Sequence, residues 1–284
     1  MKKIIYRESY SRITKLISRK QANNAPEFNP ARIILRPKYP APFCSRDMTE
    51  TKHCEQCGTC CRKGGPALSR EDLALIRQGH IHHDQLITIR QGEMGYNPAT
   101  GRLEPVPVEL LKIRGQGSGW TCLFFAEEQN GCTIYAHRPA TCRILQCRQP
   151  EPLLATIYQN TLRRADLINP SDPILAEIER HEQACPGRVF TDLLAQVGGT
   201  EDLARLSELV RADLAIRGEV AQQAGLSLEM EFFLFGRPLF KQLAGSGIEC
   251  AEKNGEIRLE RIKVTQHSPR PLVGEGSGER GNER

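Results

Sequence analysis

Four of the eleven cysteines in this 284-residue sequence lie close together, in the run Cys54-Glu55-Gln56-Cys57-Gly58-Thr59-Cys60-Cys61. A C-x2-C step lets two sulfur atoms point to the same side of a tight turn, so that both can reach one metal ion. Glycine permits the backbone angles that such a turn needs. The C-x2-C-x2-C part has the spacing that supplies three thiolates to a four-iron cluster in bacterial ferredoxins, whose fourth ligand comes from elsewhere in the chain.

A second group of cysteines follows about sixty residues later, at Cys122, Cys132, Cys142 and Cys147. Four plus four thiolates suit two four-ligand sites, or one cluster with additional structural cysteines. Soft thiolate ligands favour iron–sulfur clusters or zinc over magnesium or calcium. Basic residues flank the cysteines and would offset the negative charge of bound thiolates, namely Arg62, Lys63, Arg138, Arg143 and Arg148. The sequence therefore predicts eight metal ligands: Cys54, Cys57, Cys60, Cys61, Cys122, Cys132, Cys142 and Cys147.

The setting of the cysteines favours metal ligation over a disulfide scaffold or buried free thiols. No stretch approaches 18 consecutive apolar residues, and the segment after Met1 lacks the apolar region of a secretory signal. We therefore expect a cytoplasmic protein, in which thiols stay reduced. A 4Fe-4S iron–sulfur cluster is the favoured cofactor, with zinc as the alternative. Adjacent Cys60 and Cys61 cannot easily both bind one zinc ion without strain, so one of them is expected to serve a second site.

The role of Cys185 stays open, because two interpretations compete. A proline follows it, as one follows a cluster ligand in bacterial ferredoxins, but a buried structural cysteine is the favoured interpretation. Cys44 and Cys250 are expected not to bind metal. The run from His80 to His83 is interpreted as an exposed turn at a helix end rather than a metal site. His137 is expected to be a hydrogen-bonded structural residue.

The chain divides into four parts by composition. Residues 1–47 form a basic N-terminal arm that we expect to be weakly ordered, and Met48 leaves open whether this arm belongs to the native product. Residues 48–165 form the cysteine-cluster metal-binding domain. Residues 166–264 form a mainly helical part that ends in a β-hairpin. Residues 265–284 are polar and glycine-rich and are expected to be disordered.

Net charge is uneven along the chain. Ten lysines and arginines against Glu8 and Glu27 give residues 1–40 a charge of +8, whereas the remainder carries 29 basic and 32 acidic side chains. Because the folded part is close to neutral, general nucleic-acid binding is not expected. The protein partner cannot be named from the sequence.

Local signals place helices and a hairpin around the cysteines. Ser69 begins a helix that ends at Gly79, residues 201–224 repeat apolar side chains at helical spacing, and Ser227 begins another helix. The dipeptide Asn254-Gly255 is typical of a tight hairpin turn. Together these signals predict an α+β fold with an irregular cysteine-rich metal-binding core of loops and short strands covered by α-helices.

Three segments together resemble a known family. They are the cysteine run at 54–61, the Gly-Gly-Pro at 64–66, and the segment Ile134-Tyr135…Arg138-Pro139-x-x-Cys142-Arg143. They resemble the CxxCxxCC family, the YkgJ-type zinc- or iron-chelating proteins of bacteria, over roughly residues 50–150. The resemblance implies that the eight cysteines named above are ligands. A related branch, the flagellin lysine methylases, contains a similar cluster and transfers methyl groups, although nothing in this sequence matches a complete methyl-donor site.

Three functional hypotheses follow. The first is a metal-binding protein whose cluster has a structural or redox role. The second is a cluster-dependent enzyme such as a protein lysine N-methylase, and the sequence does not decide whether the chain is an enzyme. The third is a zinc-stapled interaction module that uses the basic arm.

Overall fold

The structure is a computed structural model that describes residues 54, 56–117, 119–146, 149–253 and 256–262. The N-terminal arm, Cys44, Cys147, the turn dipeptide at 254–255 and the C-terminal tail lie outside the described residues. Helices and two-stranded antiparallel sheets alternate in what is described, which confirms the predicted α+β class. None of the described helices combines the length and apolar character that crossing a bilayer requires.

The first half of the described chain is built from short elements. In chain order they are α2 (Thr59–Lys63), η1 (Arg70–Asp72), α3 (Leu73–Arg77), η2 (His83–Gln85), β1 (Leu86–Ile89), β2 (Met94–Asn97), β3 (Arg102–Pro105), β4 (Leu110–Ile113), β5 (Phe125–Ala126), β6 (Gly131–Cys132), η3 (Tyr135–His137), α4 (Ala140–Ile144), α5 (Glu151–Leu154) and η4 (Arg164–Asp166). Strand β1 pairs with β4, with Leu86 opposite Ile113, and β2 pairs with β3 as a hairpin between them.

The second half is mainly helical. It contains α6 (Ile174–Ala184), α7 (Gly187–Gln196), α8 (Thr200–Ala224), α9 (Leu228–Phe235), α10 (Leu239–Gln242), and the antiparallel pair β7 (Ile248–Lys253) and β8 (Glu256–Arg261). The expected apolar stripe of α8 is buried at Leu206, Val210 and Leu214. Ser227 caps α9 by accepting a hydrogen bond from the Met230 N–H, as its position predicts.

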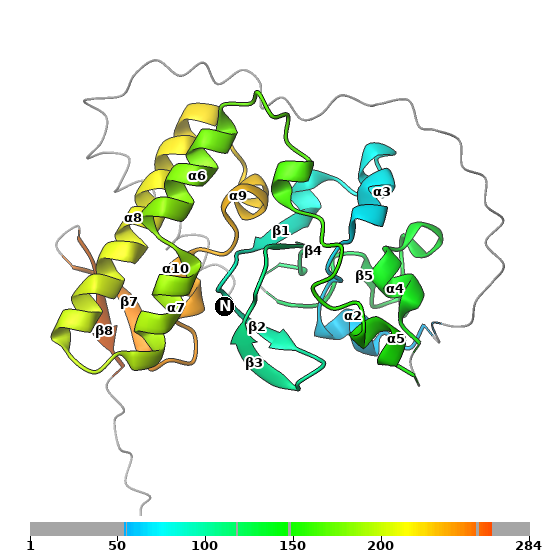
Figure 1. The fold of residues 1–284 in the computed structure, drawn as a ribbon, viewed down its shortest axis with the longest axis horizontal. Coiled ribbons are helices and arrows are strands. Elements are labelled where there is room, and N and C mark those ends of the chain that lie inside the picture. The colour runs from blue at the N-terminus through cyan, green and yellow to red at the C-terminus, as the bar shows by residue number, and fades with distance from the viewer. Residues whose placement is uncertain (1–53, 55, 118, 147–148, 254–255, 263–284) are drawn as a thin grey trace, which may run out of the picture.

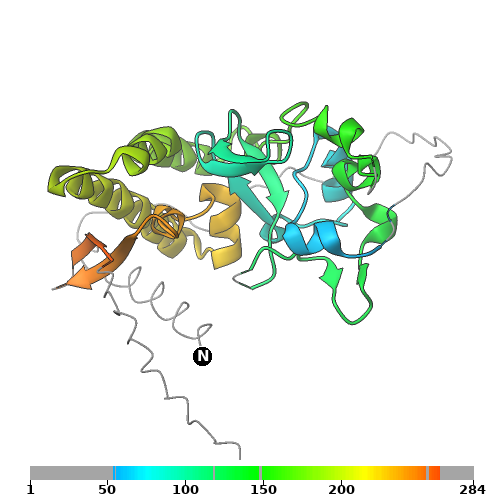
Figure 2. The same ribbon diagram turned by 90° about the horizontal axis from the view of Figure 1, so that it is seen from below.

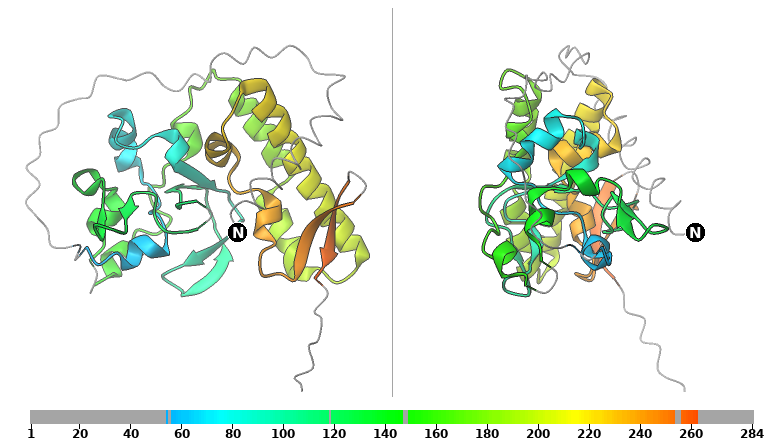
Figure 3. Two further views of the ribbon diagram at one scale, coloured as in Figure 1. Left: turned by 180° about the vertical axis from the view of Figure 1, so that it is seen from behind. Right: turned by 90° about the vertical axis from the view of Figure 1, so that its right-hand side faces the viewer.

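Two hydrophobic cores hold these halves. One runs from the cysteine-bearing segments through β1 and β4 to α9, and it includes Cys122, Phe125 and Phe233. The other lies between α7, α8, α10 and the β7–β8 pair. Figures 1 and 3 show α8 and β8 at one end of the molecule and α4 and α5 at the other. The C-terminal helices therefore meet the cysteine-bearing half through α9 and β1, where the Thr88 hydroxyl donates to the Phe233 carbonyl at 2.5 Å.

Candidate metal centre

A pocket in the N-terminal half gathers cysteines from both stretches of the sequence. It is lined by Cys54, Cys57, Cys60, Cys61 and Cys132, together with Gln56, Gly58, Phe125, Gly131 and Tyr135. Cys122 and Cys142 lie within electrostatic range of the pocket, since burial raises the pKa of both thiols and negative charges on Cys60 and Cys132 add to that rise. Five of the seven predicted ligands that the structure describes therefore line one pocket, the other two lie near it, and Cys147 lies outside the described residues.

Backbone contacts join the two cysteine stretches directly. The Cys122 N–H donates to the Cys61 carbonyl at 2.7 Å. Gly65 packs so closely on the neighbouring segment that a Cβ atom would stand 2.1 Å from the Ile113 carbonyl oxygen. Residue 65 must therefore be glycine for the chain after Cys61 to lie against the segment that leads to Cys122. Figure 2 shows the result, with α2 (blue) beside the β5–β6 pair (green).

Helix α4 positions Cys142, and buried polar contacts fix that helix. One carboxylate oxygen of Asp72 accepts from the Ala140 N–H at 2.7 Å, and the other accepts from the Ser69 N–H at 2.9 Å. The Thr141 hydroxyl donates to the Ala67 carbonyl at 2.6 Å. The predicted cap at residues 69–72 therefore does more than begin a helix. Its buried carboxylate also ties α4 to the segment that follows the cysteine run.

The turn that carries Cys54 and Cys57 depends on unusual backbone geometry. Gly58 has a φ of +75°, and a Cβ atom there would stand 2.6 Å from the Phe125 ring. Arg62 donates to the Cys57 carbonyl at 3.2 Å and forms an ion pair with Glu127 at 3.0 Å. The glycine that the sequence places in this turn is thus required twice, by conformation and by space.

Burial sets the protonation of the thiols. Desolvation, together with the charges of the neighbouring cysteines, raises the pKa of Cys61 to about 12. Burial likewise raises the pKa values of Cys122 and Cys142. These thiols therefore hold their protons at neutral pH when no cation is present. Metal ligation requires thiolates, so a cation that binds them must displace protons into solvent.

The charge arrangement around Cys132 fits a thiolate-bound metal centre. Burial raises the pKa of the Cys132 thiol, and the Arg138 charge opposes that rise. The Arg138 guanidinium stacks on the Tyr135 ring at 3.9 Å, and its Nη1 is buried with no hydrogen-bond partner among the described residues. An anionic cluster of thiolates would give this buried nitrogen a negatively charged acceptor. The donor set and the unpaired Arg138 nitrogen therefore agree with bound iron or zinc.

The remaining cysteine and histidine predictions have separate outcomes. Cys185 is fully buried in the second core, away from the pocket-lining residues, which agrees with the structural interpretation. Cys250 lies in β7, also in the second core. His80 stacks on His137 with ring centroids 3.6 Å apart, a ring contact that the spacing of the two residues did not predict.

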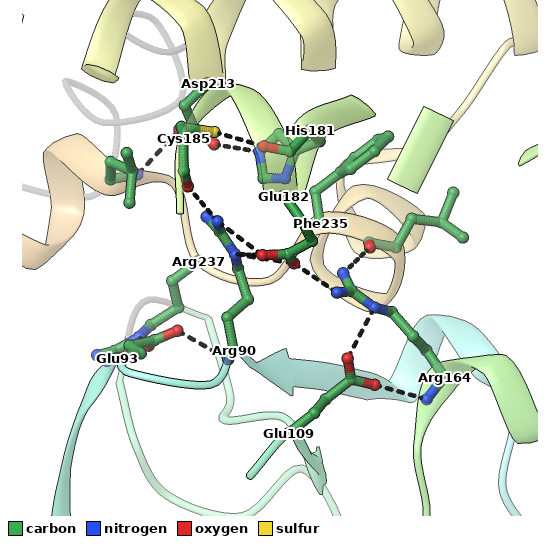
Figure 4. Close-up of polar contacts among 12 residues, drawn as sticks. Arg90, Glu93, Glu109, Arg164, His181, Glu182, Cys185, Asp213, Phe235 and Arg237 are labelled. Carbon is green, nitrogen blue, oxygen red and sulfur yellow. Dashed lines mark hydrogen bonds and ion pairs between the residues drawn. The ribbon is translucent and has the colours of Figure 1, made fainter. Parts of the chain in front are cut away.

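A cluster of buried polar side chains around Cys185 was not predicted from the sequence. His181 Nε2 lies 2.7 Å from Asp213 Oδ1, and the Cys185 thiol lies 3.1 Å from the His181 carbonyl (Figure 4). The Arg217 Nε–H donates to the same Asp213 oxygen at 2.7 Å. Ligand atoms of His181, Cys185 and Asp213 lie within 4.8 Å of one another, a spacing that one metal ion could bridge. A cation there would face the Arg217 guanidinium and break hydrogen bonds that already satisfy the carboxylate, so we assign this group to structure.

Further ion pairs connect this group to the sheet. Arg90, buried at the end of β1, donates through Nε to Glu182 at 3.0 Å, and Arg164 pairs with Glu109 at 3.1 Å (Figure 4). The first pair links the end of β1 to α6, and the second links η4 to the residue before β4, at the junction between the halves. No motif marks them, because each joins residues more than fifty positions apart in the chain.

Comparison with known proteins identifies one family model that matches this chain. The model is CxxCxxCC, described as "Putative zinc- or iron-chelating domain", and it matches residues 53–186. The matched segment contains both cysteine stretches and the whole pocket. No curated protein and no solved structure matches the chain significantly.

Proposed function

We propose, from the match of residues 53–186 to the model of the CxxCxxCC zinc- or iron-chelating domain, that the cysteine pocket holds an iron–sulfur cluster, with zinc as the alternative, in a structural or redox role. The observation that carries the proposal is the convergence of seven cysteines, from two stretches about sixty residues apart, on one pocket and its immediate surroundings. The proposed ligands are drawn from Cys54, Cys57, Cys60, Cys61, Cys122, Cys132, Cys142 and Cys147.

Two features support iron–sulfur over zinc. Seven described thiols exceed the four that a single tetrahedral zinc ion takes. The first three cysteines have the spacing by which bacterial ferredoxins hold a four-iron cluster. When bound, such a cluster supplies a centre that accepts or donates one electron.

The protein's own groups have definable roles around this centre. The cysteines provide thiolates and release protons as they do so. Phe125 and Tyr135 form the apolar wall of the pocket and restrict water. Arg138 holds a positive charge beside Cys132 and offsets the negative charge of the bound thiolates.

Metal analysis with visible absorption spectroscopy of anaerobically purified protein tests this function. We expect iron and inorganic sulfide in the wild type and in Cys250→Ser, a control whose thiol lies in the other core. Cys122→Ser should lose the metal, and far-UV circular dichroism will show whether this buried variant folds. Cys60→Ser gives a second, less buried position for the same measurement. A colourless protein with stoichiometric zinc would remove the iron version, and native protein devoid of both metals would overturn the proposal.

A further inference from the structure

Most of the exposed apolar side chains gather in one stretch of the chain. Six large hydrophobic side chains are exposed among the described residues, and four of them lie between residues 94 and 120. They are Met94 (37% exposed), Tyr96 (65%), Leu103 (68%) and Trp120 (54%), and we call them the hairpin patch. Single exposed apolar residues are ordinary, whereas a group that lies together marks a surface that contacts a partner.

The β2–β3 hairpin carries three members of the patch on one face. Tyr96 stands directly opposite Leu103 in the pairing of the two strands. Met94 lies two residues before Tyr96, so its side chain points to the same side of the hairpin. All three side chains are exposed, and the apolar face of this hairpin is therefore turned toward solvent.

Polar contacts hold the opposite face of the hairpin inward. Asn97 is buried, and its side-chain amide donates to Glu104 at 2.5 Å. Gly95 shares this face and lies so close to Val106 that a Cβ atom would stand 2.8 Å from the valine side chain. A shift of the strands by one residue would turn the apolar face inward, but it would break these contacts. The structure therefore keeps the apolar face in solvent.

Arg237 joins Trp120 to the base of the hairpin. Its Nη2–H donates to the Met94 carbonyl at 3.2 Å, and its Cζ lies 5.2 Å from the centroid of the Trp120 ring. The fully buried carboxylate of Glu93 pairs with the same guanidinium and holds it in place. The patch therefore lies on and beside the hairpin, which projects at the lower edge of the molecule in Figures 1 and 3.

Basic side chains flank the patch. Arg102 is exposed next to Leu103 at the end of the hairpin. Lys63 is exposed next to Gly64. A Cβ atom on Gly64 would lie 3.7 Å from the Trp120 carbonyl oxygen, so this lysine belongs to a segment beside the tryptophan.

The acidic side chains of the same stretch are engaged within the protein. Residues 94–120 contain two of them, Glu104 and Glu109. Glu104 accepts from Asn97 on the inner face of the hairpin, and Glu109 pairs with Arg164 at 3.1 Å. The surface therefore combines apolar and aromatic side chains with positive charge.

An anionic lipid surface fits this combination. Tryptophan and tyrosine rings settle at the level of the lipid headgroups, and basic side chains are attracted to anionic headgroups. A second copy of the chain would instead bring like charges together. Residues 1–40 carry a charge of +8. Stable attachment to a membrane takes two weak signals, such as a basic segment together with an apolar one, and this chain contains both.

We propose that the hairpin patch is a membrane-contact surface, which binds the headgroup layer of an anionic lipid bilayer. The contact is peripheral and reversible, because it transfers side chains from water to the interface and forms no covalent bond. It also places the cysteine-bearing half at the membrane, since Trp120 precedes Cys122 by only two residues.

Tryptophan fluorescence of the full-length protein tests this surface directly, because Trp120 is the single tryptophan of the chain. We expect its emission to shift to shorter wavelength on addition of vesicles made of equal parts phosphatidylcholine and phosphatidylserine. Brominated phosphatidylcholine in these vesicles should quench the emission. Vesicles of phosphatidylcholine alone should bind more weakly, and added salt should weaken binding to the mixed vesicles, because it screens the attraction between charges.

Co-sedimentation of variants with the mixed vesicles measures the contribution of the hairpin. Tyr96→Ser/Leu103→Ser should weaken binding about tenfold, because two apolar side chains no longer leave water. Arg102→Gln should weaken it about two- to fivefold through the loss of one basic charge near the lipid. The control Ile262→Ser changes an exposed aliphatic side chain just after β8 and should bind as wild type. Far-UV circular dichroism and metal content should be the same in all four proteins.

Three results would overturn the proposal. Vesicle binding without any change in Trp120 emission would mean that residues 1–40 carry the binding alone. Equal binding by wild type and by the Tyr96→Ser/Leu103→Ser variant would exclude the hairpin. Failure of the wild type to bind the mixed vesicles, as expected of a patch that contacts an acidic protein or a second copy, would exclude a membrane-contact role.

Discussion

Replacing Asp213 with asparagine should destabilise the protein by about 3–5 kcal/mol, the cost of breaking a buried charge pair from one side. Asp213 is fully buried, and its carboxylate accepts from His181 on α6, Arg217 on α8 and the Leu239 N–H on α10. An asparagine offers one acceptor oxygen and turns an NH2 group toward at least one of these donors. The substitution therefore leaves the Arg217 charge buried without its counter-charge.

This cost is large against the total stability of a domain, which is about 5–15 kcal/mol. With a denaturant slope of about 2–3 kcal/mol per molar, the urea midpoint should fall by about 1–2 M. Urea unfolding followed by circular dichroism at pH 7 measures the shift. Wild type and variant must have the same metal content, because metal bound to the folded state adds stability of its own.

Asp192→Asn is the matched control. Asp192 pairs with Arg188 one helical turn away at 2.8 Å, but both side chains are largely exposed. The loss should stay below about 1 kcal/mol, because solvent screens such pairs. The reasoning would be refuted if Asp213→Asn unfolded at the same urea concentration as Asp192→Asn.

Three further predictions concern pH and the pocket. Burial lowers the pKa of His181 from 6.5 to about 4, so between these pH values the unfolded chain binds a proton that the folded protein does not bind. The free energy of unfolding should therefore fall by up to about 3 kcal/mol as pH drops from about 6.5 to 4. Urea midpoints measured across this window test the prediction, and His181→Gln should show a weaker pH dependence. Gly58→Ala should lower both metal content and stability, because the new Cβ would be strained at this positive φ and would clash with the Phe125 ring. Gly225 has a similar φ but open space around it, so Gly225→Ala should cost about 1 kcal/mol and keep the metal, which metal analysis measures. Because burial raises the pKa of Cys61 to about 12, metal uptake by apo-protein should release protons, and metal affinity should increase as pH rises. Calorimetry in buffers of different ionisation enthalpy measures the proton release, and uptake without it would contradict the prediction.

Features that depend on neighbours in the chain could be predicted from the sequence. The caps at Ser69 and Ser227 and the need for glycine at residue 58 follow from local geometry, and the structure confirms them. The α+β class follows from the mixture of helical periods and hairpin signals, and it is also confirmed. The division of the chain into four parts remains a prediction, as does the assignment of all eight ligands.

Long-range pairing could not be predicted in the same way. The spacing of the cysteines indicates metal ligation, but it does not say that folding buries Cys122 and leaves Cys57 exposed. The spacing also does not distinguish Cys185 from the pocket cysteines, although folding places Cys185 beside His181 and Asp213 in the other core.

The sequence by itself determined the chemistry of this protein, because residue type and short spacing decide which atoms can bind a soft metal and which turns can form. Only the tertiary structure decided which thiols are buried, which are exposed and which charge lies beside them, as Arg138 lies beside Cys132. The physical reason is that burial and electrostatic environment arise from packing between segments distant in the chain, and no local pattern specifies that packing.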